Sequence, residues 1–478
     1  MISAFFDDPS SLTAILLGLA LIAIALASAL HALLNKKDSV SALGWVTFCL
    51  VLPLIGPVFY LVFGINRIMA AAKESYHPAL VTDSDKLFGD PAQTDFRAYA
   101  AVGQMVTASG LHSCDDLQVL ENGECSFPAM LADIASAKKK IYLTTYIFQN
   151  DEIGQHFYES LCAAQARGVD VRLLLDGLGG IAYPPTLWRK LRRSELNMRY
   201  FNPITLLPPS LHINLRNHRK ILVVDGKIAY TGGQNITDRH NISKPNNPKC
   251  ARDLHFRLTG KIVDDLERAF LRDWYHRVDD QDEAEFSPSN ESRSESAIWT
   301  RLILDGPNEH LDKLNEVLLG VFSAAQKRIW IMTPYFLPGP VLIGALQAAS
   351  LRGVDVRIFL PERTNIHLAH YAAQHTLPYL LDKGLAIYLQ PPPFIHTKAI
   401  LIDDCYALIG SANLDPRSLR LNFELGVEVF SREFASKIAD YFNVCQASAR
   451  RVTSENSVAL PLLKRIRNAV AWLFSPYL

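Results

Sequence analysis

Two long apolar runs without charged residues lie near the start of the chain. No Asp, Glu, Lys or Arg occurs over Leu12–Leu34 or over Val40–Ile65. Each run exceeds the roughly 20 residues that a helix needs to cross a bilayer, so the pattern predicts two transmembrane helices. Pro53, Gly56 and Pro57 lie inside the second run and leave open a kinked helix or a re-entrant segment.

The first run is predicted to be a membrane anchor. A cleaved signal peptide would carry Lys or Arg before a shorter apolar stretch, whereas Asp7 and Asp8 precede this one. Basic residues stand on both sides of the second run, so the positive-inside rule leaves the orientation in the membrane open.

Further along, the hydrophobic pattern is duplicated. A basic pair opens an apolar run at 139–143 and again at 327–331, and the sequence Arg-Gly-Val-Asp-Val-Arg occurs at Arg167–Arg172 and at Arg352–Arg357. In each copy a helix-like stretch separates two strand-like runs, which is the βαβ arrangement. The repeat predicts tandem α/β domains with mixed β-sheets flanked by helices.

Composition sets the expected boundaries of these segments. Residues 279–297 are rich in Asp, Glu, Ser and Asn and nearly free of large apolar side chains, which is typical of a linker. The predicted segments are a membrane anchor at 1–66, a connector at 67–115, a first domain at 116–278, the linker at 279–297, a second domain at 298–450 and an amphipathic C-terminal helix at 451–478. That helix either docks on the body or lies at a membrane interface.

Charge and cysteine usage narrow the function classes. Lys plus Arg and Asp plus Glu each count 48, so the strongly basic balance of a dedicated nucleic-acid binder is missing. The seven cysteines form no CxxC pair and no Cys/His cluster, which argues against a zinc site and against a disulfide framework. We therefore expect neither a metal nor another cofactor.

The strongest chemical signal is a duplicated His-x-Lys-x4-Asp element. Its members are His218, Lys220 and Asp225 in the first copy and His396, Lys398 and Asp403 in the second. After each Asp and six intervening residues comes a short glycine-containing sequence that ends in Asn, and the candidates there are Gly233, Asn235, Ser411 and Asn413. The same spacing throughout both copies is hard to obtain by chance.

These residue types suit phosphodiester chemistry. Side chains two apart in a strand point to one face, so each His shares a site with its Lys. A neutral imidazole can attack phosphorus while Lys⁺ neutralises the non-bridging oxygens, and a Gly step with an Asn amide can approach a phosphate closely. If the halves pack face to face, one His can be the nucleophile and the other the acid and then the base, without a metal.

Four acidic residues have two possible roles each. Asp253 and Glu424 follow the motif asparagines by 18 and 11 residues; each can orient a His ring through a hydrogen bond or can be an ordinary ion-pair partner. Asp225 and Asp403 stand at predicted hairpin corners, where a turn role is as good an explanation as a direct catalytic one.

The duplicated element resembles the signature of the phospholipase D superfamily. That signature usually has Ser where the first copy has Gly233, and we expect a small effect because the backbone amide remains. With the apolar segments before the tandem domains, nearly the whole chain is similar to bacterial cardiolipin synthases. The resemblance implies an α/β fold of two tandem phospholipase D-like domains with mixed β-sheets flanked by helices, preceded by two transmembrane helices.

The resemblance also implies a reaction. One phosphatidylglycerol gives its phosphatidyl group to a second through a phosphohistidine, with cardiolipin and glycerol as products. By analogy with relatives, His218 attacks and His396 protonates the leaving glycerol and then deprotonates the acceptor. The implied partners are phosphatidylglycerol, other phospholipids and a lipid bilayer, with no nucleic acid, and the implied location is the bacterial inner membrane as a multi-pass protein.

Three other functions remain open at this point. A phospholipase D would hand the phosphatidyl group to water and release phosphatidic acid. A nuclease of the same superfamily is disfavoured by the zero net charge and the apolar segments. A non-catalytic scaffold that binds anionic lipid would tolerate replacement of His218 or His396.

Overall fold

The computed structural model describes two compact units, Met1–Ser75 and Tyr76–Leu478. The described residues are 9–36, 38–64, 96–179, 195–203, 205–206, 209–210, 215–244, 247, 249–275, 298–308, 310–453 and 460–475. The predicted linker at 279–297 and most of the predicted connector lie outside the described residues.

In the N-terminal unit, one helix is long and apolar enough to cross a membrane. Helix α2 spans Pro9–Asn35, and its apolar part covers Thr13–Asn35. The second apolar run instead gives α3 (Ser39–Val51), α4 (Ile55–Phe59) and a π-helical turn at Tyr60–Gly64. This helix points to a membrane anchor.

The expected second continuous transmembrane helix is not found among the described residues. Helix α3 has 13 residues, which gives about 20 Å of helix, well short of the hydrocarbon core. The break falls between Val51 and Ile55, at Pro53, which lacks the backbone N–H that would continue the helix. The run folds back on α2, because the His31 Nδ1 lies 2.8 Å from the Tyr60 hydroxyl.

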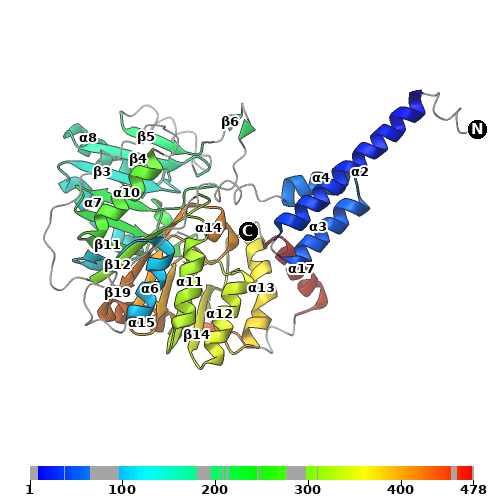
Figure 1. Cartoon of the computed structure of the whole chain (residues 1–478). Helices are drawn as coiled ribbons and strands as arrows, with labels where there is room; N and C mark the ends of the chain where they lie inside the picture. Colours follow the sequence, from blue (N-terminus) through cyan, green and yellow to red (C-terminus); the bar gives the residue numbers. More distant parts are fainter. Residues whose placement is uncertain are drawn as a thin grey trace, which may run out of the picture. The chain divides into compact units, whose positions relative to one another are not determined.

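The first half of the second unit is built on a seven-stranded mixed sheet. In spatial order its strands are β2 (Leu117–Glu121), β11 (Leu254–Thr259), β9 (Ile228–Gly232), β8 (Ile221–Val224), β3 (Lys140–Thr145), β4 (Asp170–Asp176) and β5 (Asn197–Phe201). Strands β3, β4 and β5 are parallel, and the others pair antiparallel. Helices α7 (Asn122–Ser136) and α8 (Glu152–Ala166) cover one face, and α10 (Ile262–Trp274) covers the other (Figure 1).

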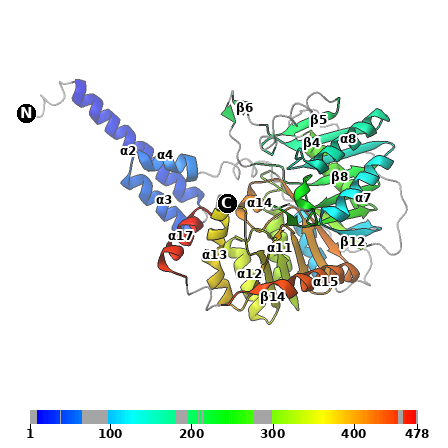
Figure 2. The same cartoon turned by 180° about the vertical axis from the view of Figure 1, so that it is seen from behind.

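The second half repeats this plan with nine strands. In order they are β1 (His112–Cys114), β12 (Ile298–Asp305), β19 (Glu424–Phe430), β18 (Tyr406–Gly410), β17 (Ala399–Ile402), β13 (Arg328–Met332), β14 (Asp355–Pro361), β15 (Ala386–Gln390) and β20 (Arg450–Arg451). The helices α6 (Arg97–Thr107), α11 (Lys313–Ala324), α12 (Pro340–Leu351) and α13 (His367–Leu381) cover its outer face, and α15 (Arg432–Ser448) its inner face (Figure 2).

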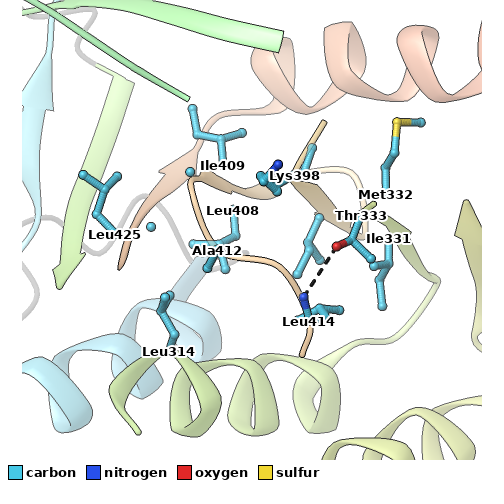
Figure 3. Close-up of a pocket in the computed structure, with 14 residues that line it drawn as sticks. Leu314, Ile331, Met332, Thr333, Lys398, Leu408, Ile409, Ala412, Leu414 and Leu425 are labelled. Carbon is cyan, nitrogen blue, oxygen red and sulfur yellow. Dashed lines mark hydrogen bonds between the residues drawn. The ribbon is translucent and has the colours of Figure 1, made fainter. Parts of the chain in front are cut away.

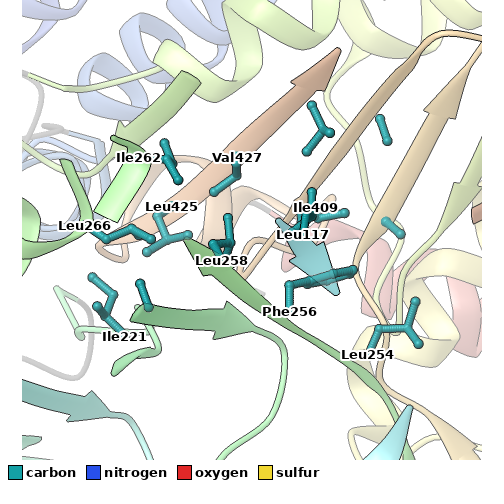
Figure 4. Close-up of a cluster of buried hydrophobic side chains, with 14 of the residues drawn as sticks. Leu117, Ile221, Leu254, Phe256, Leu258, Ile262, Leu266, Ile409, Leu425 and Val427 are labelled. Carbon is teal, nitrogen blue, oxygen red and sulfur yellow. The ribbon is translucent and has the colours of Figure 1, made fainter. Parts of the chain in front are cut away.

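One apolar core joins the two halves. It contains Leu254 and Phe256 from β11 together with Ile409 from β18 and Val427 from β19, all at most 1% exposed (Figure 4). Burying side chains of both sheets in one cluster stabilises a fixed arrangement of the halves. The histidine motifs therefore belong to one body.

The C-terminal helix α17 (Leu462–Leu473) docks on α13 through one face. The Asn468 amide donates to Gln374 Oε1 at 3.3 Å, and the Trp472 and His375 rings lie 5.1 Å apart. Its apolar face is left in solvent, with Leu463 81% and Leu473 67% exposed. Both predicted roles of this segment therefore remain compatible with the structure.

Candidate active site

Short parallel backbone contacts between the halves position both catalytic candidates. Strand β10 (Ala251–Arg252) pairs in parallel with β16 (Phe394–Ile395) of the other half, and an isolated parallel bridge joins Asn217 to Phe423. The next residues follow the same path: the His396 N–H donates to Arg252 O at 2.7 Å, and the His218 N–H donates to Phe423 O at 2.9 Å. Each histidine is thus held beside the segment that carries the other half's acidic residue.

The acidic candidates consequently pair crosswise with the histidines. His218 Nδ1 lies 3.2 Å from Glu424 Oε1, and His396 Nδ1 lies 2.7 Å from Asp253 Oδ2. Both carboxylates are fully buried. At His396 the contact with Asp253 is a hydrogen bond, which fixes the ring orientation and the tautomer and leaves Nε2 for chemistry; at His218 the Glu424 carboxylate lies on the same side of the ring.

The two lysines lie beside their histidines, as the alternation of strand side chains requires. Lys220 Nζ donates to His218 O at 2.5 Å, and Lys398 Nζ donates to His396 O at 2.6 Å while lying 3.1 Å from both ring nitrogens of His396. Burial lowers the pKa of both ammonium groups, that of Lys398 to about 7. The free site therefore holds cations that are poorly hydrated and ready to be neutralised by an anion.

Charged groups of the whole cluster shift the pKa of the His396 imidazole. Burial, then the charges of Lys398, Lys220 and His218, hold the pKa of its imidazole well below the usual range. Groups from both halves thus act on one ring. In the free enzyme His396 is neutral; a bound phosphate supplies the negative charge that offsets the lysines and raises its pKa.

The first motif is followed by Gly232-Gly233 and the second by Gly410-Ser411, and this difference has a physical reason. A Cβ at Gly233 would lie 2.5 Å from both carboxylate oxygens of Asp253. In the second half Ser411 Oγ donates to Glu424 Oε2 at 2.5 Å. In the first half, the Asp253 carboxylate thus fills the space that a side chain at residue 233 would need. We expected that Gly233 in place of Ser would have little effect, but the structure shows that the absence of a side chain makes room for this carboxylate.

The motif asparagines hold the loops that follow the strands. Asn235 Oδ1 accepts from the Ile147 N–H at 3.1 Å, and Asn413 Nδ2 donates to Ser418 Oγ at 3.1 Å. Both side chains are buried. Their contacts fasten the end of each motif hairpin to a neighbouring segment.

The motif aspartates lie at the far end of their strands from the histidines. Asp225 accepts the N–H groups of 138–140, and Asp403 accepts those of 326–328 and the Tyr99 hydroxyl. Six residues, four of them in the strand, separate each Asp from its His, which is about 20 Å of extended chain. Of the two expected roles, these contacts support the structural one, and the direct catalytic role of Asp225 and Asp403 is not supported.

Three further residues contact the histidines, and sequence patterns did not assign them to the site. The Tyr146 ring lies 4.2 Å from the His218 ring, and Asn422 Nδ2 lies 3.3 Å from His218 Nδ1. His240 Nε2 accepts the Asn235 N–H at 3.2 Å, with its ring 5.9 Å from His396. Burial lowers the pKa of His240 to about 3, so it is a neutral acceptor.

Two cavities adjoin the motif residues. A small apolar one of about 30 Å³ lies behind Lys398, where Thr333 Oγ1 accepts the Leu414 N–H (Figure 3). It has room for about one water molecule. The other, of about 710 Å³, has His396 and Asn235 in its wall, and this volume suits a lipid headgroup.

One group among the described residues has the geometry for a metal ion. Ligand atoms of His240, Asp253 and His396 lie within 4.8 Å of one another. However, Asp253 already binds His396, and the charge of Lys398 acts on all three groups. A divalent cation would have to displace these contacts against a nearby positive charge.

Comparison with known proteins gives the family. A family profile described as "Cardiolipin synthase, PLD-like domain" matches residues 130–274 and 318–445, more than half of the chain. The chain belongs to this cardiolipin synthase family. A second profile, "Phospholipase_D-nuclease N-terminal", matches residues 20–64.

Individual cardiolipin synthases are similar over the full length. "Cardiolipin synthase A" of Pseudomonas aeruginosa is 31% identical, with 99% of this chain and 98% of the relative covered. "Major cardiolipin synthase ClsA" of Bacillus subtilis is 29% identical, with 98% and 100% covered. The enzyme class predicted from the sequence is thereby confirmed: the chain is a phospholipase D-type phosphatidyltransferase of the cardiolipin synthase kind.

A solved structure supports the fold of the second unit. The phosphatidylserine synthase of Haemophilus influenzae Rd KW20 aligns with a TM-score of 0.62 at 18% identity, and the alignment covers 80% of this chain and 99% of that one. This similarity confirms the α/β architecture of two mixed sheets flanked by helices and carries no further functional detail.

Proposed function

We propose that this cardiolipin synthase joins two phosphatidylglycerol molecules at a single site shared by both halves. The observation that carries the proposal is the crosswise pairing of His218 with Glu424 and of His396 with Asp253. Because each half supplies the carboxylate that orients the other half's histidine, neither half has a complete catalytic set. The site accordingly offers two oriented imidazoles and two lysines to one phosphate.

In the first step, His218 Nε2 attacks the phosphorus of the donor lipid. The bond between phosphorus and the glycerol oxygen breaks, and protonated His396 gives its proton to that oxygen. Lys220 and Lys398 neutralise the charge that builds on the non-bridging oxygens. The products of the step are free glycerol and a phosphatidyl group on His218.

In the second step, neutral His396 acts as the base. It takes the proton from a glycerol hydroxyl of the acceptor lipid, whose oxygen forms a new bond to phosphorus while the bond from phosphorus to His218 Nε2 breaks. Asp253 stabilises the resulting imidazolium. Cardiolipin leaves, and His396 carries the proton needed for the next turnover.

We further propose that the chain works at the bacterial inner membrane as a multi-pass protein. Residues 1–66 form the anchor, 116–278 and 298–450 the catalytic domains, and the partners are phospholipids and the bilayer. The apolar helix α2 supports attachment to a membrane. The exposed apolar face of α17, with Lys464 and Arg465 beside it, supports an additional contact with anionic lipid.

A product assay tests the proposed function. Purified full-length protein is incubated with phosphatidylglycerol alone, and lipids and glycerol are quantified. We expect cardiolipin and glycerol in equal amounts, no change with a chelator, and loss of turnover in His218→Ala and His396→Ala. Phosphatidic acid as the sole lipid product would refute the transferase, and activity in both variants would refute the site.

A further inference from the structure

The larger cavity beside His396 has a strongly basic wall. Four cations, Arg239, Lys249, Arg252 and Arg363, line it together with His396, and none of its described lining residues is acidic. Arg239 and Lys249 come from the first half and Arg363 from the second, so the cavity opens between the two halves. Its wall includes His396 but not His218, which makes the surroundings of the two histidines different.

Three of them, Arg239, Lys249 and Arg363, have no acidic partner among the described residues, whereas Arg252 contacts the Cys445 thiol. By contrast, the nearby Lys244 pairs with Glu152 and Asp238. Arg239 is close enough for its charge to lower the pKa of His396. Unpaired cations that converge on one concave surface attract an anion.

The chemistry of the reaction supplies such an anion. An acceptor phosphatidylglycerol brings a second phosphate, which is not consumed and is joined through a short glycerol chain to the hydroxyl that must reach His396. In the proposed mechanism Lys220 and Lys398, which lie beside their histidines, already serve the phosphate under attack. The acceptor phosphate therefore needs cations other than these two lysines. Those cations must lie about as far from His396 as the glycerol chain that joins the phosphate to the reacting hydroxyl is long.

We propose that this cavity is the acceptor subsite, where Arg239, Lys249 and Arg363 bind the phosphate of the second phosphatidylglycerol. The inference rests on the proposed function and adds an assignment of the two substrates to different sides of the site. By holding a lipid anion beside the base, the three cations direct the phosphatidyl group to a lipid and away from water. They are specificity-determining residues.

A comparison of two acceptors, one anionic and one neutral, tests whether the three cations bind the acceptor phosphate or support catalysis in general. Full-length enzyme and the variants Arg239→Ala, Lys249→Ala and Arg363→Ala are given the same phosphatidylglycerol with ethanol present. Cardiolipin reports the anionic acceptor, and phosphatidylethanol reports a neutral one. We expect cardiolipin formation to fall about 10-fold or more per variant, the effect of losing a charge-assisted hydrogen bond, with phosphatidylethanol formation within about twofold of the wild type.

The controls separate failure of this inference from failure of the proposed function. Lys383→Ala removes an exposed cation of the same half that does not line the cavity, and both products should be unchanged. Arg363→Lys should recover part of the cardiolipin yield. Equal losses of both products, or no loss of either, would overturn the acceptor subsite, whereas absence of cardiolipin from the wild type would overturn the proposed function itself.

Discussion

At the scale of single residues, close packing around the crosswise carboxylates decides what can be substituted. Asp253 occupies the space beside Gly233, and Ser411 binds Glu424. The pattern of motif residues predicted which side chains gather at the site, because strand alternation is a local property. It could not predict that each acid serves the other half's histidine, because that pairing follows from how the halves pack.

Gly233→Ser is expected to harm the enzyme, although it restores the residue usual in the superfamily. The new Cβ would displace the Asp253 carboxylate and with it His396, and a shift of about 1 Å at a catalytic group can cost about 100-fold in rate. Steady-state kinetics of cardiolipin formation would measure the loss in kcat. Ser411→Gly, the reverse change at the equivalent position of the second half, is the comparison, because it removes a side chain and its bond to Glu424 without adding any atom. Wild-type activity in Gly233→Ser would contradict the packing argument.

Asp403→Ala is expected to lower stability and to leave kcat nearly unchanged. The partly buried N–H groups of 326–328 and the buried Tyr99 hydroxyl would lose their acceptor, a loss of about 1–3 kcal/mol in the free energy of unfolding. Thermal unfolding and kinetics on the same sample measure both effects. The control is Asp404→Ala, which removes a partly exposed ion pair with Lys327. It should lower the free energy of unfolding by at most about 1 kcal/mol. Loss of kcat without loss of stability would restore a direct role for Asp403.

The pH dependence of kcat/KM should follow Lys398. Burial lowers its pKa to about 7, so the ammonium is present below pH 7 and is lost as the pH rises through that value. Because kcat/KM reports the free enzyme, it should fall with rising pH, with a midpoint near 7. Lys398→Arg keeps its charge over this range and should remove the fall, even if its rate is lower. A profile that is flat in the wild type would contradict the prediction.

At the scale of elements, local patterns predicted more than long-range pairing. The Asp-Gly hairpin corner after β8 forms as expected, with φ of 54° at Asp225 and 67° at Gly226. Nothing in the sequence indicated that 97–114, inside the predicted connector, would form α6 and β1 on the second half, where β1 pairs with β12. From its apolar composition we expected one long helix in the second N-terminal run. The helix is shorter because Pro53 breaks it, an effect that composition alone does not include.

The exposed face of α17 should matter only at a bilayer. The double variant Leu463→Glu, Leu473→Glu places charges at positions whose side chains are 81% and 67% exposed. The stability of the fold should therefore change little. We expect cardiolipin synthesis on anionic vesicles to fall several-fold and synthesis in detergent micelles to be unchanged. Leu351→Glu, on the equally exposed Leu351 at 82%, is the control. Equal loss in vesicles and micelles would contradict an interfacial role.

At the scale of the whole molecule, duplication gives two similar halves that are chemically unequal. The motifs and their carboxylates are related by the repeat, yet the basic cavity borders His396 and not His218. The shared apolar core of both sheets keeps the motifs together. A repeat in sequence predicts two domains; their mutual packing and the resulting inequality depend on the long-range contacts that only the folded chain reveals.

The central claim is that His218 and His396 act on one phosphorus centre in different roles. The most direct test uses His396→Ala with a phosphatidyl donor whose leaving group, p-nitrophenolate, needs no proton. The account predicts a burst of nitrophenolate and a stable phosphatidyl adduct on His218, detected by mass spectrometry, because the base for the second step is missing. His218→Ala should give neither. An adduct on any other residue, or steady turnover by either variant, would contradict the account.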